Sequence, residues 1–407
     1  MRVLVVRVAV AAVLLPAGVG AQSLSLTETQ ALARLSSESP RVKVLRAGVD
    51  VARADVLAAN RRSNPRVTFN REAVAGISEH MLLVSQSLPI SGRRAIDVSA
   101  ASARVDAASS RADDLVRRLR ADLRLAFTDL WGAQSRERDL ARRRDRLREL
   151  AELLGRREAA GEASGFDRLR ADREAIDVES ERAVAASERT RAQGALGSFF
   201  SAALDAGAIE AVRTETVPAV VPPIEDLLGL AERSRPSLAA LQHELAAAGF
   251  AERAAERRVV PDPEMVVGTK SSNAGTGDVG LVVSMHVTLP LFDRARPERA
   301  AAKARASQVR AEAETLRLIL RSEVGVWRAA VLERREIADR YRSAVAASGE
   351  QIERIAQVSY EAGEGSMLEV LDAYRSASSA RLRQATLDTA VREAEIELEF
   401  VSGWEIP

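Results

Sequence analysis

Apolar residues recur every three or four positions over long stretches of this chain, which is the spacing of one face of an α-helix. From Gly92 to Glu158 no cluster of turn residues interrupts the pattern, which predicts a helix of about 67 residues, roughly 100 Å long. The same pattern predicts long helices over residues 166–200, 296–360 and 367–402. Because helices of this length do not fit inside a compact domain, we expect an elongated molecule.

The apolar positions of these helices form narrow seams, as in coiled coils, so we expect neighbouring helices to pack along their length. The seam residues are Leu115, Leu119, Leu123, Ala126, Leu130, Leu140, Leu147, Leu150 and Leu154, and then Leu316, Leu320, Val324, Trp327, Val331, Tyr341, Val345, Ser348, Ile352 and Ile355. Glycines interrupt the helical pattern at Ala159–Gly165 and at Glu361–Ser366. At both places we expect the chain to fold back as a helical hairpin.

A different period appears between Val279 and Leu289, where apolar residues alternate with other residues over eleven positions. This period of two predicts a β-strand, and about nine to eleven residues is the length that a tilted strand needs to cross a membrane. Its partner is expected near Glu264–Lys270, so that a hairpin covers about residues 263–290. A weaker pattern predicts a shorter hairpin over about residues 65–89. Taken alone, either hairpin is more typical of the edge of a soluble sheet.

These elements occur twice along the chain. Matching motifs stand in both halves, in the same order and between 196 and 202 residues apart. They pair Pro40 with Pro236, Asn64-Pro65 with Asp262-Pro263, Leu88-Pro89 with Leu289-Pro290, Trp131 with Trp327, and Gly161 with Gly363. We therefore interpret the chain as two copies of one unit, residues 22–217 and 225–407, joined by a proline-containing linker at 218–224. Each unit is expected to hold a helix, a β-hairpin and two long antiparallel helices.

The first 21 residues have the layout of a signal peptide. Arg2 and Arg7 precede the apolar run Val8–Leu15, and the helix-breaking Pro16 and small residues up to Ala21 follow. A membrane anchor is the weaker alternative, because the run is too short to span about 30 Å of hydrocarbon. No later segment approaches the length of a transmembrane helix. The exported protein is therefore expected either to stay soluble or to enter a membrane as a β-barrel.

Composition excludes several classes of protein. The chain has 59 basic and 58 acidic residues, which argues against a dedicated nucleic-acid binder. It has no cysteine, and hence no disulfide, thiolate metal site or cysteine for a lipid anchor. Its three histidines, His80, His243 and His286, lie far apart and lack the spacing of metal ligands. We expect no enzyme activity, no cofactor and no metal site.

The predicted strands constrain the assembly. Open strand edges are not tolerated in lipid, and about eight strands form the smallest barrel with a filled interior. Two hairpins supply only four strands, so a membrane-spanning form must oligomerise, and three copies would supply twelve. A periplasmic coiled-coil scaffold or pump adaptor is the alternative, although an adaptor would have one helical hairpin where this chain has two.

The order of the motifs resembles the TolC family of outer membrane factors, which are exit ducts of tripartite efflux pumps and of type I secretion systems. The resemblance covers nearly the whole chain after the signal peptide. It rests on the repeat, on Asn64-Pro65 before the first strand, and on "SLPISGRR" and "TLPLFDRARPERAAAKA" where strands pass into helices. It also rests on the glycine turn and the following acidic helix, from Tyr360 to Ala373. The "LPLFDR" segment is similar to the heavy-metal efflux branch.

The resemblance implies a mostly α-helical homotrimer, with a twelve-stranded outer membrane β-barrel on a twelve-helix periplasmic α-barrel. It implies a periplasmic adaptor (a membrane fusion protein) and an inner membrane pump, often of the resistance-nodulation-division class, that together export drugs or metal ions. A type I secretion duct is the alternative. Two departures from the family are expected: a short first hairpin, and an aromatic girdle reduced to Phe69 and Phe292.

The resemblance also implies two sets of functional residues. The adaptor is expected to dock on the glycine turns, at Gly161, Glu162, Ser164, Gly363, Glu364 and Ser366. The periplasmic gate is expected at Asp167, Tyr360, Glu369 and Asp372, with Asp167 bonded to Tyr360 of the neighbouring hairpin. Glu369 and Asp372 are three residues apart and so share a helix face. In a trimer they would form a cation-selective ring, unless they merely solvate an ordinary helix.

Overall fold

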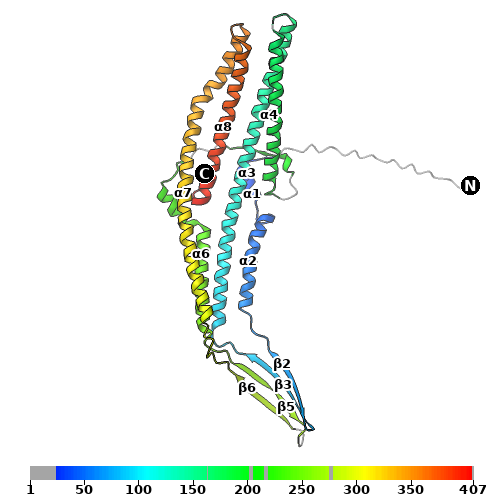
Figure 1. Cartoon of the computed structure of the whole chain (residues 1–407), viewed down its shortest axis with the longest axis vertical. Helices are drawn as coiled ribbons and strands as arrows, with labels where there is room; N and C mark the ends of the chain where they lie inside the picture. The colour runs from blue at the N-terminus through cyan, green and yellow to red at the C-terminus, as the bar shows by residue number, and fades with distance from the viewer. Residues whose placement is uncertain (1–23, 163, 201–204, 215–218, 275–277, 406–407) are drawn as a thin grey trace, which may run out of the picture.

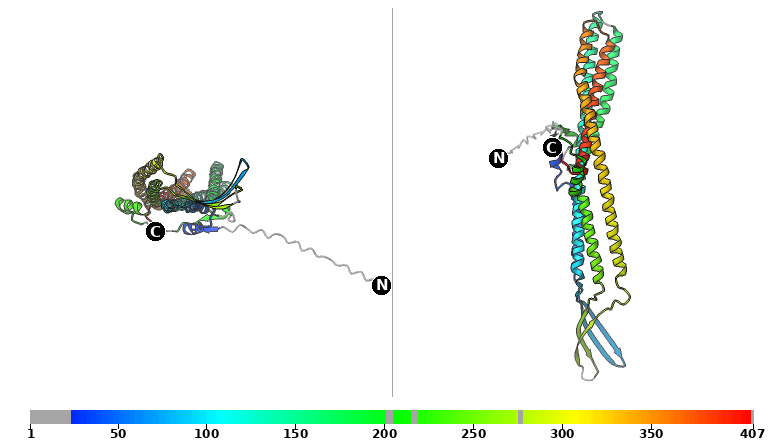
Figure 2. Two further views of the ribbon diagram at one scale, coloured as in Figure 1. Left: turned by 90° about the horizontal axis from the view of Figure 1, so that it is seen from below. Right: turned by 90° about the vertical axis from the view of Figure 1, so that its left-hand side faces the viewer.

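The computed structural model describes residues 24–162, 164–200, 205–214, 219–274 and 278–405, and the expected signal peptide lies outside them. The described chain is elongated. A small sheet lies at one end, long helices run away from it, and two helical turns form the other end (Figure 1). The right-hand view of Figure 2 shows the long helices running side by side along this axis.

The sheet joins the two halves of the chain. Its strands are antiparallel and neighbour one another in the order β2-β3-β5-β6, so that β3 pairs with β5 across the repeat. The strands are β2 (Arg66–Val74), β3 (Ile77–Ser87), β5 (Glu264–Ser272) and β6 (Val279–His286). In this register Val67 lies opposite Val84, which lies opposite Val267 and then Val283. One face of the sheet is therefore apolar, yet it is exposed to solvent in the single chain.

Two expectations about the strands were wrong. Strand β6 ends at His286 and does not continue to Leu289, because its partner strand begins opposite it at Glu264, and the preceding Pro263 has no N–H for a ladder. The first hairpin is not short, since β2 and β3 have 9 and 11 residues. Its turn is only two residues long, with φ of 53° at Ala75 and 82° at Gly76. A tight turn of this kind matches the twist of the flanking strands.

The long helices lie side by side in a single row, and the helices that make up this row near the sheet differ from those that make it up near the turns. The helices are α2 (Pro40–Ala59), α3 (Arg93–Ala159), α4 (Gly165–Gly197), α6 (Pro236–Arg257), α7 (Arg296–Glu361) and α8 (Met367–Ser402). Near the sheet, α3 packs between α2 and α6, and α6 packs against α7. Towards the turns, α3 packs between α4 and α8, and α8 packs against α7. Only α3 and α7 run the full length of the row.

Short elements pack around the middle of the molecule, where α4 and α8 replace α2 and α6 as the neighbours of α3. Strands β1 (Leu24–Leu26) and β4 (Ile209–Ala211) pair in parallel, and helix α1 (Glu28–Arg34) packs with them against α3. The 3-10 turn η1 (Ala206–Ala208) leads into β4, and helix α5 (Ile224–Ser234) packs against α7 and α8. Of the described helices, none has an apolar stretch long and uncharged enough to cross a membrane.

The predicted seams are buried where a second helix lies against them. Leu123 and Leu130 are completely buried in the middle of α3, and Leu154 is completely buried nearer the turns. Within one chain, three seam residues remain uncovered: Leu115 is 50% exposed, and Ile352 and Ile355 are 47% and 56% exposed. A helix in a row has at most two neighbours, so the seam pattern continues onto faces that nothing covers within one chain.

Leu123 offers a test of the central core. Its side chain is completely buried among residues of β1, α1, α4 and β4. Replacing it by alanine should lower the free energy of unfolding by about 2–5 kcal/mol, because the change removes apolar contacts and leaves a cavity. Thermal unfolding followed by circular dichroism measures this loss. Leu115→Ala, on the same helix but half exposed, should have a much smaller effect.

Ion pairs hold α1 against α3 and α8. Glu28 accepts hydrogen bonds from Arg124 at 2.5 Å and from Arg392 at 2.8 Å, and Arg124 also pairs with Glu399. Burial alone would raise the pKa of Glu28, but the charges and hydrogen bonds of Arg392 and Arg124 outweigh it. The pKa of Glu28 therefore lies below its ordinary value of 4.5.

This network should make the attachment of α1 sensitive to acid. A carboxylate with a lowered pKa contributes stability above its ordinary pKa, and the contribution is lost as the pH falls through the folded value. The protection of the α1 amides from hydrogen exchange, relative to their intrinsic rates at the same pH, should therefore fall below about pH 4.5 in the wild type. The variant Glu28→Gln should exchange faster at neutral pH and show no such step. A step that persisted in this variant would assign the effect to another carboxylate.

Candidate functional site

The turn between α3 and α4 is built from backbone hydrogen bonds and one cap. Gly161 has a φ of 76°, in the left-handed region that suits glycine. The N–H of Gly161 donates to the carbonyl of Glu158 at 3.0 Å, and the N–H of Glu162 donates to Arg157 at 2.8 Å. Ser164 then caps α4, since its hydroxyl accepts from the N–H of Phe166. The turn is exposed, as a docking surface requires.

The turn between α7 and α8 repeats this construction. Gly363 has a φ of 74°, and its N–H donates to the carbonyl of Tyr360 at 3.1 Å. The N–H of Glu364 donates to Ser359 at 2.9 Å, and Ser366 caps α8. Each of these positions lies 202 residues after its counterpart in the first turn. The six residues predicted for docking thus occupy two matching turns at one end of the molecule (Figure 1).

Glu369 has a structural contact that the sequence analysis did not assign to it. Its carboxylate accepts from the N–H of Ser366 at 3.0 Å, while the Ser366 hydroxyl accepts from the N–H of Glu369 at 3.3 Å. This reciprocal pair is a capping box, and it satisfies two N–H groups at the start of α8. Asp372 lies one turn later and is exposed. Both carboxylates therefore remain accessible, although Glu369 also holds the helix start.

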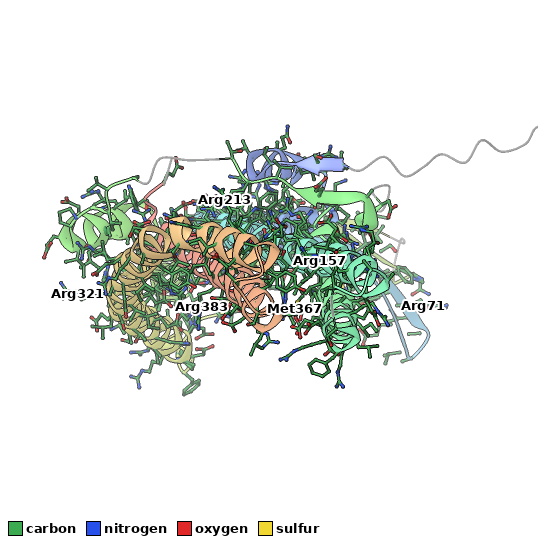
Figure 3. All side chains as sticks on the ribbon, turned by 90° about the horizontal axis from the view of Figure 1, so that it is seen from above. Arg71, Arg157, Arg213, Arg321, Met367 and Arg383 are labelled. Atoms are coloured by element: carbon green, nitrogen blue, oxygen red, sulfur yellow. The ribbon has the colours of Figure 1, made fainter. Side chains whose placement is uncertain are left out.

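Asp167 and Tyr360 are not joined within one chain. Among the described residues there is no hydrogen bond between their side chains, and the guanidinium of Arg157 lies 5.7 Å from the centre of the Tyr360 ring. Arg157 also donates to the carbonyl of Glu361 at 3.4 Å. Figure 3 looks onto this end of the molecule and labels Arg157 on α3 and Met367 at the start of α8. The contact between α3 and α7 at the turns is thus made by Arg157.

A buried charge cluster lies closer to the middle of the molecule. Glu353 of α7 is only 5% exposed and pairs with Arg146 of α3 and with Arg381 of α8, the latter at 3.3 Å. A second cluster joins Glu174 of α4 to α3 and α8 through Arg143 and Arg375. These links tie the two helical hairpins together within one chain. Sequence analysis missed them, because arginine and glutamate are common on every helix.

The two outer helices of the row carry exposed apolar side chains. Helix α4 packs against α3, and helix α7 packs against α8, so that these two form the opposite edges of the row near the turns. Exposed apolar residues on α4 are Phe166, Leu169, Ile176 and Val184, and those on α7 are Ile352, Ile355 and Val358. Their exposed fractions lie between 47% and 68%. Apolar stripes of this kind mark surfaces that another molecule covers.

The gate residues that the structure describes include no metal-binding cluster. Within the described ranges, no group of three histidine, cysteine or acidic residues is close enough to hold a metal ion. The described residues at the turns offer carboxylates, exposed backbone and the Arg157–Tyr360 contact. Carboxylates in such a position can bind cations and select them by charge.

Comparison with known proteins gives matches over most of the chain. Residues 227–403 match the model of the outer membrane efflux protein family. The chain is 25% identical to the cobalt-zinc-cadmium resistance protein CzcC of Cupriavidus metallidurans over 296 residues, which cover 73% of this chain and 70% of that protein.

Solved structures have the same fold. A membrane protein from Pseudomonas aeruginosa is 22% identical with a TM-score of 0.74, and the match covers 92% of this chain and 93% of that one. The CmeC outer membrane channel of Campylobacter jejuni is 13% identical with a TM-score of 0.76, covering 92% and 85% of the two chains. At these identities the likeness establishes the arrangement of helices and strands.

Proposed function

Because this chain is a TolC-like outer membrane efflux protein, we propose that three copies of it form a duct across the outer membrane and the periplasm. The observation that carries this proposal is that the chain has two open edges along its whole length. Strands β2 and β6 are the unpaired edges of the sheet. In the helical row, α7 forms one edge, and the other edge is α2 near the sheet and α4 near the turns.

The two edges differ from each other, so copies must join head to tail. Contacts of this kind close into a ring when the rotation allows it. In the sheet, β6 of one copy would pair with β2 of the next, which would satisfy the backbone groups that lipid leaves unpaired. In the helical part, the apolar residues of α7 would cover those of α4. Three copies supply twelve strands and leave room for a lumen.

The exposed apolar face of the sheet supports a position in the membrane. Val67, Leu281 and Val283 are each at least 64% exposed, and they share this face with Phe69 and Leu82. A barrel closed from three such sheets would turn this face to lipid and the more polar face to the lumen. The helical part would then extend into the periplasm, where the glycine turns would meet a periplasmic adaptor and an inner membrane pump.

The cargo proposed here is metal ions, with drugs as the broader class. This proposal is supported by the relative named for cobalt, zinc and cadmium resistance. We expect the chain to restore resistance to these ions in a host that has lost its own exporter but retains the matching adaptor and pump. If the chain restored resistance to drugs but not to these ions, the assignment would move to the multidrug branch.

Assembly is the direct test of the duct. The purified full-length protein should be a trimer in detergent by native mass spectrometry and should conduct ions in a planar bilayer. Phe166→Glu together with Ile176→Glu should prevent trimer formation, because charge on the α4 edge cannot be buried. Thr190→Glu adds a charge at an exposed position of the same helix that lies off this apolar stripe, so it is the matched control and should assemble. A stable, non-conducting monomer of the wild type would contradict the proposal.

We further propose that Arg157 holds the periplasmic end of the duct closed. It joins α3 to α7 at the turns through the Tyr360 ring and the Glu361 carbonyl. An exposed cation–π contact is worth about 0.5–1 kcal/mol, so Arg157→Gln should raise the open population about two- to fivefold. Single-channel recording measures this. Tyr360→Phe keeps the ring and should behave like the wild type, and equal conductance in all three proteins would place the gate elsewhere.

A further inference from the structure

Arginines gather where the helices pass into the strands. The four junctions comprise residues 60–66, 88–94, 257–264 and 287–299, and they lie at one level between the helices and the sheet (Figure 1). They contain ten arginines, here called the arginine belt: Arg61, Arg62, Arg66, Arg93, Arg94, Arg257, Arg258, Arg294, Arg296 and Arg299. Only four acidic residues share these segments. The excess of six positive charges contrasts with an excess of one for the whole chain.

Most of the arginine belt has no partner within the described chain. Arg93 pairs with Asp97 and Arg258 pairs with Glu298, while Arg94 and Arg299 donate to backbone carbonyls. The remaining six make no side-chain hydrogen bond or ion pair among the described residues, and all six are exposed: Arg61, Arg62, Arg66, Arg257, Arg294 and Arg296. Elsewhere on the molecule arginines commonly pair with acidic residues of a neighbouring turn. The belt therefore presents uncompensated positive charge.

Apolar side chains stand beside these charges. Ile90, Leu289 and Leu291 are between 65% and 67% exposed, and Phe292 is 99% exposed. Three of the junctions also meet around a cavity of about 430 Å³, whose lining includes Arg257, Phe292 and the paired Arg93 and Arg258. A surface that combines guanidinium groups with exposed aliphatic and aromatic side chains matches an amphiphile better than a free anion.

We propose that the arginine belt binds the phosphate headgroups of anionic phospholipids in the inner leaflet of the outer membrane. This inference rests on the proposed function, because only a membrane-inserted sheet brings the belt to the headgroup level. The apolar face of the sheet begins directly beyond the belt, at Val67 on β2 and Met285 on β6, so acyl chains and headgroups would meet the surfaces that suit them. The belt would then fix the depth of the sheet in the membrane.

Lipid retention tests the proposal. Full-length trimer is reconstituted into nanodiscs of phosphatidylethanolamine with added phosphatidylglycerol, extracted, and examined by native mass spectrometry. One arginine near an anionic surface contributes about a fivefold preference, so two around one headgroup should favour phosphatidylglycerol about twentyfold. Replacing the six unpaired arginines by glutamine should reduce the preference to about threefold or less. The matched control replaces six exposed, unpaired arginines on the helices and should keep the preference: Arg170, Arg191, Arg317, Arg321, Arg354 and Arg383.

Two further measurements separate the outcomes. The wild-type preference should weaken as salt is raised, because screening shortens the reach of exposed charges. Inorganic phosphate should not displace the lipid at comparable concentration, and displacement would overturn the proposal in favour of a free-phosphate site. A wild-type trimer that inserts and conducts but retains both lipids equally would also overturn it, leaving the duct intact. A wild type that fails to enter the bilayer would instead contradict the proposed function itself.

Discussion

Replacing both Gly161 and Gly363 by valine should abolish export while leaving assembled protein in the membrane. Both glycines have φ near 75°, and no atom lies within 4 Å of the place where a Cβ would stand. The defect would therefore come from backbone strain and not from a clash. A β-branched residue held in the left-handed region costs about 1–3 kcal/mol, so both turns should change shape. Metal resistance and cross-linking to the adaptor should be lost together.

Two control variants show whether the turn shape is responsible. Asparagine tolerates the left-handed region, so Gly161→Asn with Gly363→Asn should retain most of the activity. Gly48→Val, in the interior of α2 where a Cβ also meets nothing within 4 Å, should leave export intact. Normal resistance in the double valine variant would mean that the adaptor does not depend on these turns.

Replacing Glu369 by glutamine and Asp372 by asparagine should remove cation selectivity from the channel. Three copies would bring six carboxylates to the narrow end of the duct, where a ring of like charge favours cations. Glutamine at position 369 can still accept from the N–H of Ser366, so the capping box should survive and only the charge is removed. The measurement is the reversal potential under a salt gradient, which should move close to zero in the double variant.

The matched control removes two other carboxylates from the same turn. Glu361 and Glu364 are exposed but lie before the start of α8. Changing both to glutamine should leave the selectivity unchanged. If the two double variants shift the reversal potential equally, the selectivity reflects the general charge of this end, and Glu369 serves only as a helix cap.

Periodicity predicted the long elements well because it is a local property of the sequence. The helix expected over residues 92–158 is Arg93–Ala159, and the one expected over 296–360 is Arg296–Glu361. The end of β6 was less accurate, since alternation continues through Val287 and Leu289 after the pairing has stopped. Alternation records which side chains share a face, and it does not record whether a partner strand is still present.

The contacts at the gate were not predictable in the same way. Arg157 and Glu361 are 204 residues apart, and Arg146 and Glu353 are 207 apart. With 59 basic and 58 acidic residues in the chain, charge alone selects no particular pair. The role of Glu369 as a cap is different, because Ser366 followed three residues later by glutamate at a helix start is a local signal. In the sequence analysis, Glu369 was assigned to the gate, and this local capping signal was not considered.

The packing of α8 between α3 and α7 has a consequence for biosynthesis. Helix α3 leaves the ribosome long before its neighbour α8, and Leu154 precedes Met367, the first residue of α8, by 213 residues. At about 5–20 residues per second this interval lasts roughly 10–40 s. During that time the leucines of α3 that α8 will cover, Leu147 and Leu154 among them, have only α4 to shield them. We therefore expect chaperones that bind unfolded chains to bind the growing chain at this stage. The apolar face of α3 is fully covered only when α8, the last helix, has been made.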